Sequence, residues 1–289
     1  MELVAGIIDV FADGPLRGNP LAVVEGADGL DDHQMRLLAR EFNQAETTFI
    51  LRSERADRKL RSFTAAGAEV FGAGHNALGA WLWLGENGGL GELSTPRTFQ
   101  QEIGTDVLPI EIARIDGFVH GRMRQSPLRL SRPIDDVGPL ARALRIRVTD
   151  IRSEPSTRAA DTGASHLMVR VANPEVVDMV CADADPLHAV LHAAEAEGCY
   201  VYAFDESSRA TAYARFFNPT VGLWEDAATG TAAGPLAAYL GASGLLKGDS
   251  LTVEQGTKMG RKSILRVRLM PESELSGAGV IVLRGTLRL

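Results

Sequence analysis

The segment from Glu225 to Leu240 reads EDAATGTAAGPLAAYL, and it decides how the rest of the chain is interpreted. Two acidic residues lead into a short Thr/Gly turn, and the turn leads into a helix with almost no polar face. A helix that is apolar all round is buried in a core. Its N-terminus presents free backbone N–H groups beside a carboxylate, which favours an anion. The alternative is that Asp226 or Thr229 only caps the helix.

An earlier segment of the chain repeats this pattern. Residues Phe71 to Leu84 read FGAGHNALGAWLWL, so a glycine turn again opens an apolar helix. The lead-in segments also match, because Arg61-Ser62-Phe63 precedes the first copy and Arg215-Phe216-Phe217 precedes the second. Two copies about half a chain apart indicate one duplication and not a solenoid. We therefore expect two half-domains with buried central helices, whose N-termini meet at a shared cleft for a small molecule.

The bulk composition excludes several classes of function. With 289 residues, 45% hydrophobic and 23% charged, the chain is typical of a globular protein. The net charge of -7 argues against a nucleic-acid surface. The apolar runs are too short for a membrane span, and we recognise no signal peptide. The two cysteines, Cys181 and Cys199, form no disulfide framework. We expect a cytoplasmic protein with no nucleic-acid or membrane partner.

Several local signals predict elements of secondary structure. Asp31 is placed to cap a helix that runs to about Glu41. The dipeptide Asp116-Gly117 between two alternating runs predicts a tight hairpin. Residues Val4 to Phe11 and Leu21 to Val24 are expected to form a strand pair around a long turn.

The residue Glu46 opens a predicted buried strand, ETTFIL. It is either a solvated strand end or a general base, because apolar walls disfavour the ionised form of a carboxyl and let it exchange a proton near neutral pH. His75 follows Gly74 at the start of the first apolar helix. It is either structural or a hydrogen-bond partner of Glu46 or of the substrate.

Other short segments of the chain do not match known functional motifs. The run from Gly72 to Gly79 lacks the G-x-G-x-x-G spacing of dinucleotide-binding proteins. We find no P-loop lysine and no G-x-S-x-G nucleophile motif. His188 and His192 are four residues apart, but the string HAVLH lacks the glutamate of a metalloprotease and a third ligand. We therefore expect a plain helix face there and no metal site.

With these segments in view, the chain resembles the PhzF-like family, named for the phenazine-biosynthesis isomerase. The matching segments span nearly the whole chain in the family's order: Asp9-Val10-Phe11, Arg17 to Val24, Glu46-Thr47-Thr48-Phe49, Gly74-His75 with Leu78-Gly79, Glu225 to Gly234, Glu254-Gln255-Gly256 and Met259-Gly260-Arg261.

The resemblance implies the diaminopimelate-epimerase-like fold. This α+β fold has two similar half-domains, each a barrel-like, mostly antiparallel sheet around a central buried helix, with the active site between them. We place the N-terminal half-domain at residues 1–127 and the C-terminal half-domain at residues 128–277. The last strand, residues 278–289, is expected to return to the first half.

The resemblance also implies which residues act. Epimerases of this fold use two cysteines at the helix starts, but Ala73 and Thr229 occupy those places here, so a two-thiol racemisation is not expected. The PhzF-like pattern implies one carboxylate, Glu46, as acid and base. It further implies that His75 and Asp226 assist and that four residues line the substrate pocket: Asn19, Gly74, Gly230 and Thr231. The chain departs from the family at Thr231, where Ser is frequent, and at Asn76, where small residues or Pro are usual.

By the same resemblance, the reaction is a cofactor-independent isomerisation of trans-2,3-dihydro-3-hydroxyanthranilate in phenazine biosynthesis. The expected partner is a small-molecule carboxylate substrate, the expected assembly is a homodimer, and no metal is implied. Two alternatives stay open: an isomerase or epimerase of another small carboxylate, and a non-catalytic binding protein on the same fold.

Overall fold

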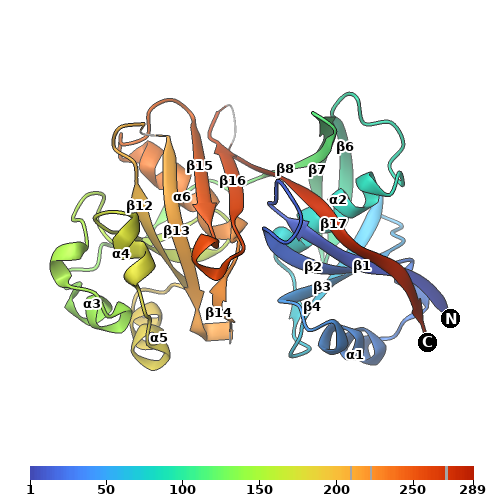
Figure 1. Cartoon of the computed structure of the whole chain (residues 1–289), viewed down its shortest axis with the longest axis horizontal. Coiled ribbons are helices and arrows are strands. Elements are labelled where there is room, and N and C mark those ends of the chain that lie inside the picture. Colours follow the sequence, from blue (N-terminus) through green and yellow to red (C-terminus); the bar gives the residue numbers. More distant parts are fainter. Residues whose placement is uncertain (209, 222, 271–272) are drawn as a thin grey trace. The chain divides into compact units, whose positions relative to one another are not determined.

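The computed structural model describes residues 1–208, 210–221, 223–270 and 273–289, and Figure 1 shows the chain coloured by sequence. The chain divides into two compact units. Unit 1 consists of Met1–Arg124 and Ser276–Leu289, and unit 2 consists of Gln125–Leu275. Each unit is described separately below.

In unit 1, whose residues are all described, eight strands form a closed ring. In ring order they are β1 (Glu2–Val10), β2 (Asn19–Glu25), β3 (Glu46–Leu51), β4 (Arg58–Thr64), β6 (Arg97–Ile103), β7 (Asp106–Ile115), β8 (Phe118–Arg124) and β17 (Glu274–Arg288). The ring closes because β17 pairs with β8 and, antiparallel, with β1 from Val10↔Gly279 to Glu2↔Arg288. The pairs β2–β3 and β4–β6 are parallel. A short strand, β5 (Glu69–Val70), pairs with β4.

The helix α2 (His75–Glu86) is the core of unit 1, and eleven of its twelve residues are buried. It packs against six strands of the ring: β1, β2, β3, β4, β7 and β8. The close approach of α2 to β1 and β2 depends on Gly79, where an added Cβ would lie 2.5 Å from Leu21 Cδ2 and 2.7 Å from Val10 Cγ2. Burial of one apolar helix inside a closed sheet confirms the fold predicted from the sequence.

Two local predictions in unit 1 are also confirmed. The helix α1 (Asp32–Phe42) begins after Asp31, whose side chain accepts from Gln34 N in a capping box. The helix covers β3 and β4, where Met35 and Leu38 join the same apolar cluster as Phe63. The hairpin between β7 and β8 turns at Asp116 and Gly117, both with positive φ, as a primed turn requires.

Unit 2 repeats the strand connections of unit 1. Its strands are β9 (Arg129–Leu130), β10 (Arg158–Asp161), β11 (Ser165–Arg170), β12 (Gly198–Phe204), β13 (Thr211–Asn218), β14 (Leu223–Asp226), β15 (Ser250–Gln255) and β16 (Ser263–Arg268). The order β10-β11-β12-β13-β15-β16 has the same sequence of antiparallel and parallel pairings as β1-β2-β3-β4-β6-β7. This repetition supports the duplication inferred from the two glycine turns.

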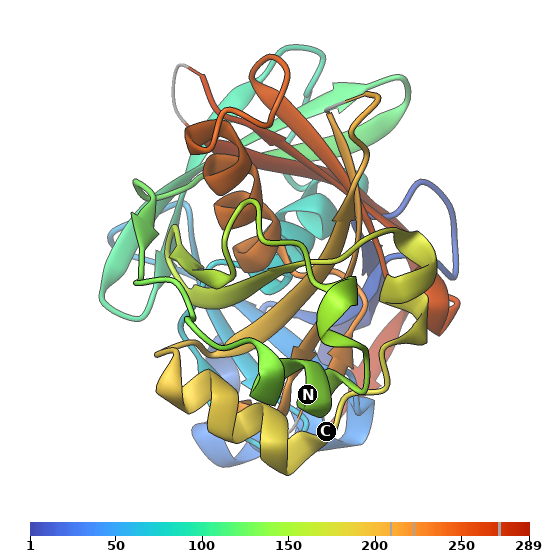
Figure 2. The same cartoon turned by 90° about the vertical axis from the view of Figure 1, so that its left-hand side faces the viewer.

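The helix α6 (Gly230–Ala242) occupies in unit 2 the place that α2 has in unit 1. It follows β14, precedes β15 and packs against β10, β11, β15 and β16 (Figures 1 and 2). The helices α3 (Gly138–Leu144), α4 (Pro174–Met179) and α5 (Ala184–Ala193) form a second apolar cluster with β11 and β12. Four short 3₁₀ helices complete the described elements: Ala27–Gly29, Val148–Asp150, Pro219–Val221 and Thr257–Met259. Within the described ranges, no helix combines the length and the apolar character that a bilayer span requires.

The segment before each central helix is held by an arginine–glutamate ion pair, and the two pairs have the same geometry. Arg61 donates to both carboxylate oxygens of Glu69 at 2.7 and 2.8 Å, and Arg215 donates to both of Glu225 at the same distances. Each guanidinium also lies over a phenylalanine ring of its own strand. A bidentate pair of this kind fixes direction as well as distance. Of the two acidic residues that open the segment from Glu225 to Leu240, the first is therefore a structural anchor.

Candidate active site

The strand β3 and the helix α2 bring two of the predicted catalytic residues together in unit 1. Glu46 is the first residue of β3 and pairs with Thr64 of β4. His75 is the first residue of α2, and its Nδ1 lies 3.9 Å from Glu46 Oε2. The Glu46 side chain is only 19% exposed, so it is not a fully solvated strand end. The separation is too long for a hydrogen bond but short enough for proton exchange through a small shift or a bound group.

The imidazole of His75 is neutral at pH 7. Burial lowers its pKa to about 4, because desolvation disfavours the charged form. The contact with Glu46 is therefore not a salt bridge at neutral pH. His75 Nε2 is buried and makes no hydrogen bond to any described residue. A neutral imidazole with one uncommitted nitrogen is suited to hydrogen-bond a ligand or to relay a proton.

The glycine turn before α2 is shaped by Asn76, one of the two residues at which the sequence differs from the expected family pattern. Asn76 Oδ1 accepts from Gly74 N at 2.8 Å, and Asn76 Nδ2 donates to Ser62 Oγ at 3.1 Å and to Gly72 O at 3.0 Å. Its side chain is almost fully buried. The amide thus ties the turn to β4, so this departure has a structural explanation.

Asn19 and Gly74 hold well-defined places in unit 1. Asn19 is the first residue of β2, is 2% exposed and pairs with Val10 of β1. Gly74 is the N-cap residue of α2 and has no side chain with which to cap the helix. Both residues lie where a strand or a helix begins, and their role in lining a substrate pocket stays a prediction.

The remaining candidates lie together in unit 2, at the N-terminus of α6. Asp226 ends β14, and Gly230 and Thr231 begin α6. Thr229 occupies the N-cap position, but its side chain makes no capping bond, so the capping interpretation is wrong for this residue. Its hydroxyl donates instead to Asp226 Oδ2 at 2.6 Å. Such a short O–H···O distance is typical of a bond to a charged acceptor.

The sequence did not single out His166, which contacts Thr231. His166 Nε2 lies 3.1 Å from Thr231 Oγ1, and its ring meets Phe216 edge to face at 4.9 Å. The side chain is 2% exposed, and its Nδ1 makes no hydrogen bond to the described residues. The signal that could have revealed it is an imidazole directly before the apolar run Leu167-Met168-Val169 of β11.

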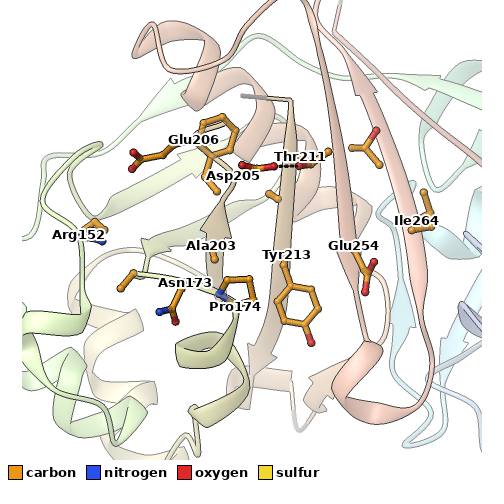
Figure 3. A pocket seen from close by; sticks show the side chains of 14 residues that line it. Arg152, Asn173, Pro174, Ala203, Asp205, Glu206, Thr211, Tyr213, Glu254 and Ile264 are labelled. Atoms are coloured by element: carbon orange, nitrogen blue, oxygen red, sulfur yellow. Dashed lines mark hydrogen bonds between the residues drawn. The ribbon is translucent and has the colours of Figure 1, made fainter. Parts of the chain in front are cut away.

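Two further features of unit 2, the pair His188 and His192 and a cavity, do not involve the candidate residues. His188 and His192 are exposed on α5, and the described residues contain no cluster of three His, Cys, Asp or Glu that could hold a metal. Unit 2 has a cavity of about 790 Å³, lined among others by Asn173, Tyr213 and Glu254 (Figure 3). None of the candidate site residues is among the described residues that line this cavity.

The two buried histidines predict a pH-dependent stability. Burial lowers the pKa of His166, like that of His75, to about 4, against 6.5 in an unfolded chain. The unfolded state therefore binds more protons than the folded state between these values, so stability is complete above about pH 6.5 and falls as the pH decreases towards 4. Each histidine should cost about 2 kcal/mol at pH 5.

Urea titrations at pH 7 and pH 5 check this prediction. Wild type should lose more free energy of unfolding between the two pH values than His166→Gln does, because the variant lacks one buried imidazole. His188→Gln, at an exposed position, serves as the control and should behave as wild type. Equal losses in wild type and His166→Gln would contradict the prediction.

Comparisons with known proteins identify the family of the chain. The family model described as phenazine biosynthesis-like protein matches residues 8–285. The chain is 32% identical over 290 residues to the trans-2,3-dihydro-3-hydroxyanthranilate isomerase of Pseudomonas chlororaphis, covering 97% of this chain and 98% of the relative. It is 31% identical over 296 residues to an uncharacterized isomerase of Clostridium acetobutylicum, covering 97% and 96%.

A solved structure supports the same assignment. The PhzF-family phenazine biosynthesis protein of Bacillus anthracis superposes with a TM-score of 0.89 at 25% identity, covering 100% of both chains. The match of nearly the whole chain to one family model and the shared fold lead to a single conclusion. The chain belongs to the PhzF family, the phenazine biosynthesis-like proteins, and is an isomerase.

Proposed function

We propose that this isomerase moves a proton within a small cyclic amino or hydroxy acid, without a cofactor, and that its substrate is most like trans-2,3-dihydro-3-hydroxyanthranilate. The observation that carries the proposal is a pair of largely buried groups 3.9 Å apart: Glu46 at the start of β3 and neutral His75 at the start of α2. The relative from Pseudomonas chlororaphis, which is named for this reaction, supports the choice of substrate.

In the proposed reaction, Glu46 removes a proton from the carbon that bears the hydroxyl group. It then returns a proton to another ring carbon, and the enol that forms becomes a ketone. The product has the same atoms as the substrate, so no oxidant or reductant is required. One carboxyl that accepts and then donates the proton is sufficient for this step.

The other candidates bind and orient the substrate. His75 and Asp226 hold the amino and hydroxyl groups of the substrate and exchange protons with them. The backbone N–H groups at the starts of α2 and α6, together with Thr231, hold the carboxylate and any negative charge that develops. Asn19, Gly74 and Gly230 line the pocket in this proposal.

Incubation of the purified protein with trans-2,3-dihydro-3-hydroxyanthranilate tests the proposal. We expect the ultraviolet band of the substrate to decay and, in D₂O, the product to gain one deuterium. An enzyme-dependent decay without deuterium would contradict the conversion of the enol to the ketone, because the carbon that is protonated in that step takes its proton from the solvent. A folded protein that produces neither change would exclude this substrate.

A second candidate function is isomerisation or epimerisation of another small carboxylate by the same groups. It is favoured by Thr231, whose side chain is larger by one methyl group than the Ser expected at this position, and by the relative from Clostridium acetobutylicum, which is named an uncharacterized isomerase. Solvent deuterium incorporation into a panel of small cyclic and acyclic amino and hydroxy acids separates this candidate from the first.

A further inference from the structure

The side chain of Gln255 makes a complete set of hydrogen bonds within unit 2. Gln255 ends β15 and is 0% exposed. Its Nε2 donates to Asp226 O at 2.8 Å and to Thr229 Oγ1 at 3.0 Å. Its Oε1 accepts from Tyr200 Oη at 2.9 Å and from Thr229 N at 3.2 Å. A primary amide has two N–H donors and one oxygen with two lone pairs, so this amide is saturated.

The partners of Gln255 determine the direction of each hydrogen bond. Thr229 N–H is an obligatory donor, so the amide oxygen must face it; with the amide reversed, two donors would meet. Tyr200 is fully buried, and burial, followed by the negative charge of Asp226, raises its pKa, so the phenol stays protonated and donates. The amide nitrogen therefore faces Thr229 Oγ1 as a donor. The hydroxyl proton of Thr229 is then directed to its other partner, Asp226 Oδ2.

We propose that Tyr200 and Gln255 are positioning residues for the reaction: they fix the Thr229 hydroxyl as a donor to Asp226 and thereby hold this carboxylate in the orientation that binds the substrate. The proposal rests on the proposed role of Asp226. It also assigns a use to Thr229, which stands where other epimerases of the fold have a cysteine. Here the side chain orients an acid and does not itself exchange a proton.

Burial explains why this arrangement resists rearrangement. The four groups come from β12, β14, the start of α6 and β15, and all are less than 10% exposed. Tyr200 also packs against Phe216, with ring centroids 6.1 Å apart. Water has little access to replace a lost partner, so removing one hydrogen bond leaves a buried group unsatisfied. The loss of one hydrogen bond at Tyr200 or Gln255 is therefore expected to change the orientation of the Asp226 carboxylate.

Two substitutions test the proposal, with one matched control. Tyr200→Phe removes a single hydroxyl and should lower kcat/KM about three- to tenfold, the range expected for one neutral hydrogen bond. Gln255→Glu removes both N–H donors and should lower it about 10- to 100-fold, because a bond to a charged group is affected. Tyr202→Phe, two residues along the same strand and equally buried, is the control and should match wild type.

A double-mutant cycle distinguishes positioning from a general loss of structure. If Tyr200 acts through Asp226, adding Tyr200→Phe to Asp226→Asn should change kcat/KM by less than about twofold. Additive losses would overturn the proposal. Full activity of Asp226→Asn would instead overturn the proposed role of Asp226. A large loss in Asp226→Asn with none in Tyr200→Phe or Gln255→Glu would overturn this inference alone.

A crystal structure of Gln255→Glu gives a result that does not depend on the substrate. We expect the Thr229 hydroxyl to turn towards the new carboxylate and the Thr229 Oγ1–Asp226 Oδ2 distance to increase from 2.6 Å to beyond hydrogen-bonding range. An unchanged distance would overturn the proposal even if no turnover could be measured. Melting temperatures of all variants identify any that fail to fold. If Gln255→Glu is one of these, the Thr229 Oγ1–Asp226 Oδ2 distance is measured in a crystal structure of Tyr200→Phe instead.

Discussion

Glu46→Gln is expected to lower kcat by about 10²–10⁴-fold on any substrate that the protein isomerises, with little change in overall stability. Glutamine has nearly the same shape as glutamate, but its amide cannot accept a proton from carbon and return it. The effect is large because the proposed mechanism has one carboxyl for both proton transfers. The neutral imidazole of His75, 3.9 Å away, holds the substrate in the proposed mechanism and is not the group that takes the proton from carbon.

The measurement is turnover together with deuterium incorporation in D₂O. Glu46→Asp, which keeps the carboxyl but moves it back by one methylene, should retain part of the activity. Glu41→Gln, at an exposed position of α1, is the matched control for the loss of one carboxylate and should be fully active. If Glu46→Gln still exchanges solvent deuterium at the wild-type rate, Glu46 is not the base.

Trp81→Ala is expected to lower the free energy of unfolding by about 3–5 kcal/mol. Trp81 lies in the middle of α2, is 0% exposed and stacks on Phe99 with ring centroids 5.1 Å apart. Its Nε1 donates to Gln101 Oε1 at 3.0 Å, and Gln101 is itself only 1% exposed. The substitution therefore leaves both a cavity inside the closed ring of strands and a buried amide oxygen without its donor.

Urea unfolding followed by far-ultraviolet circular dichroism measures this loss. Trp81→Phe should recover part of the stability, because it refills most of the volume but not the hydrogen bond. Trp224→Ala is the control, since Trp224 is 45% exposed, and it should cost less than about 1 kcal/mol. Comparable values for Trp81→Ala and Trp224→Ala would mean that α2 does not support the unit through its core.

The two central helices could be read from the sequence because their signal is local and strong. An apolar run with no polar face, opened by a glycine turn, can only be buried, and α2 and α6 are buried along most of their length. The helix start at Asp31 and the hairpin turn at Asp116-Gly117 could be predicted equally well, because a capping box and a primed turn involve only neighbouring residues. The isomerase assignment followed from motifs spread over the chain, and the family match confirms it.

The candidate site could be predicted only in part from the sequence. The sequence pointed to Glu46 and offered His75 as its possible partner, and the structure places the two side chains 3.9 Å apart. The roles of the seven candidate residues stay a prediction for the experiments above. The partners that surround them gave little signal, since His166 lies 65 positions from Thr231 and Gln255 lies 26 positions from Thr229.

By itself, the sequence determined the duplication and the two buried helices with their glycine turns, because these depend on hydrophobic pattern and turn chemistry, which act between neighbours along the chain. The α+β architecture and the family followed from the resemblance of motifs spread over the chain, which the family match confirms. Only the tertiary structure decided that Glu225 is an anchor for Arg215, that Thr229 donates to Asp226 instead of capping its helix, and that Gln255 sets this direction. A hydrogen bond is set by distance and angle in space, and a sequence does not state which strands will place two side chains 3 Å apart.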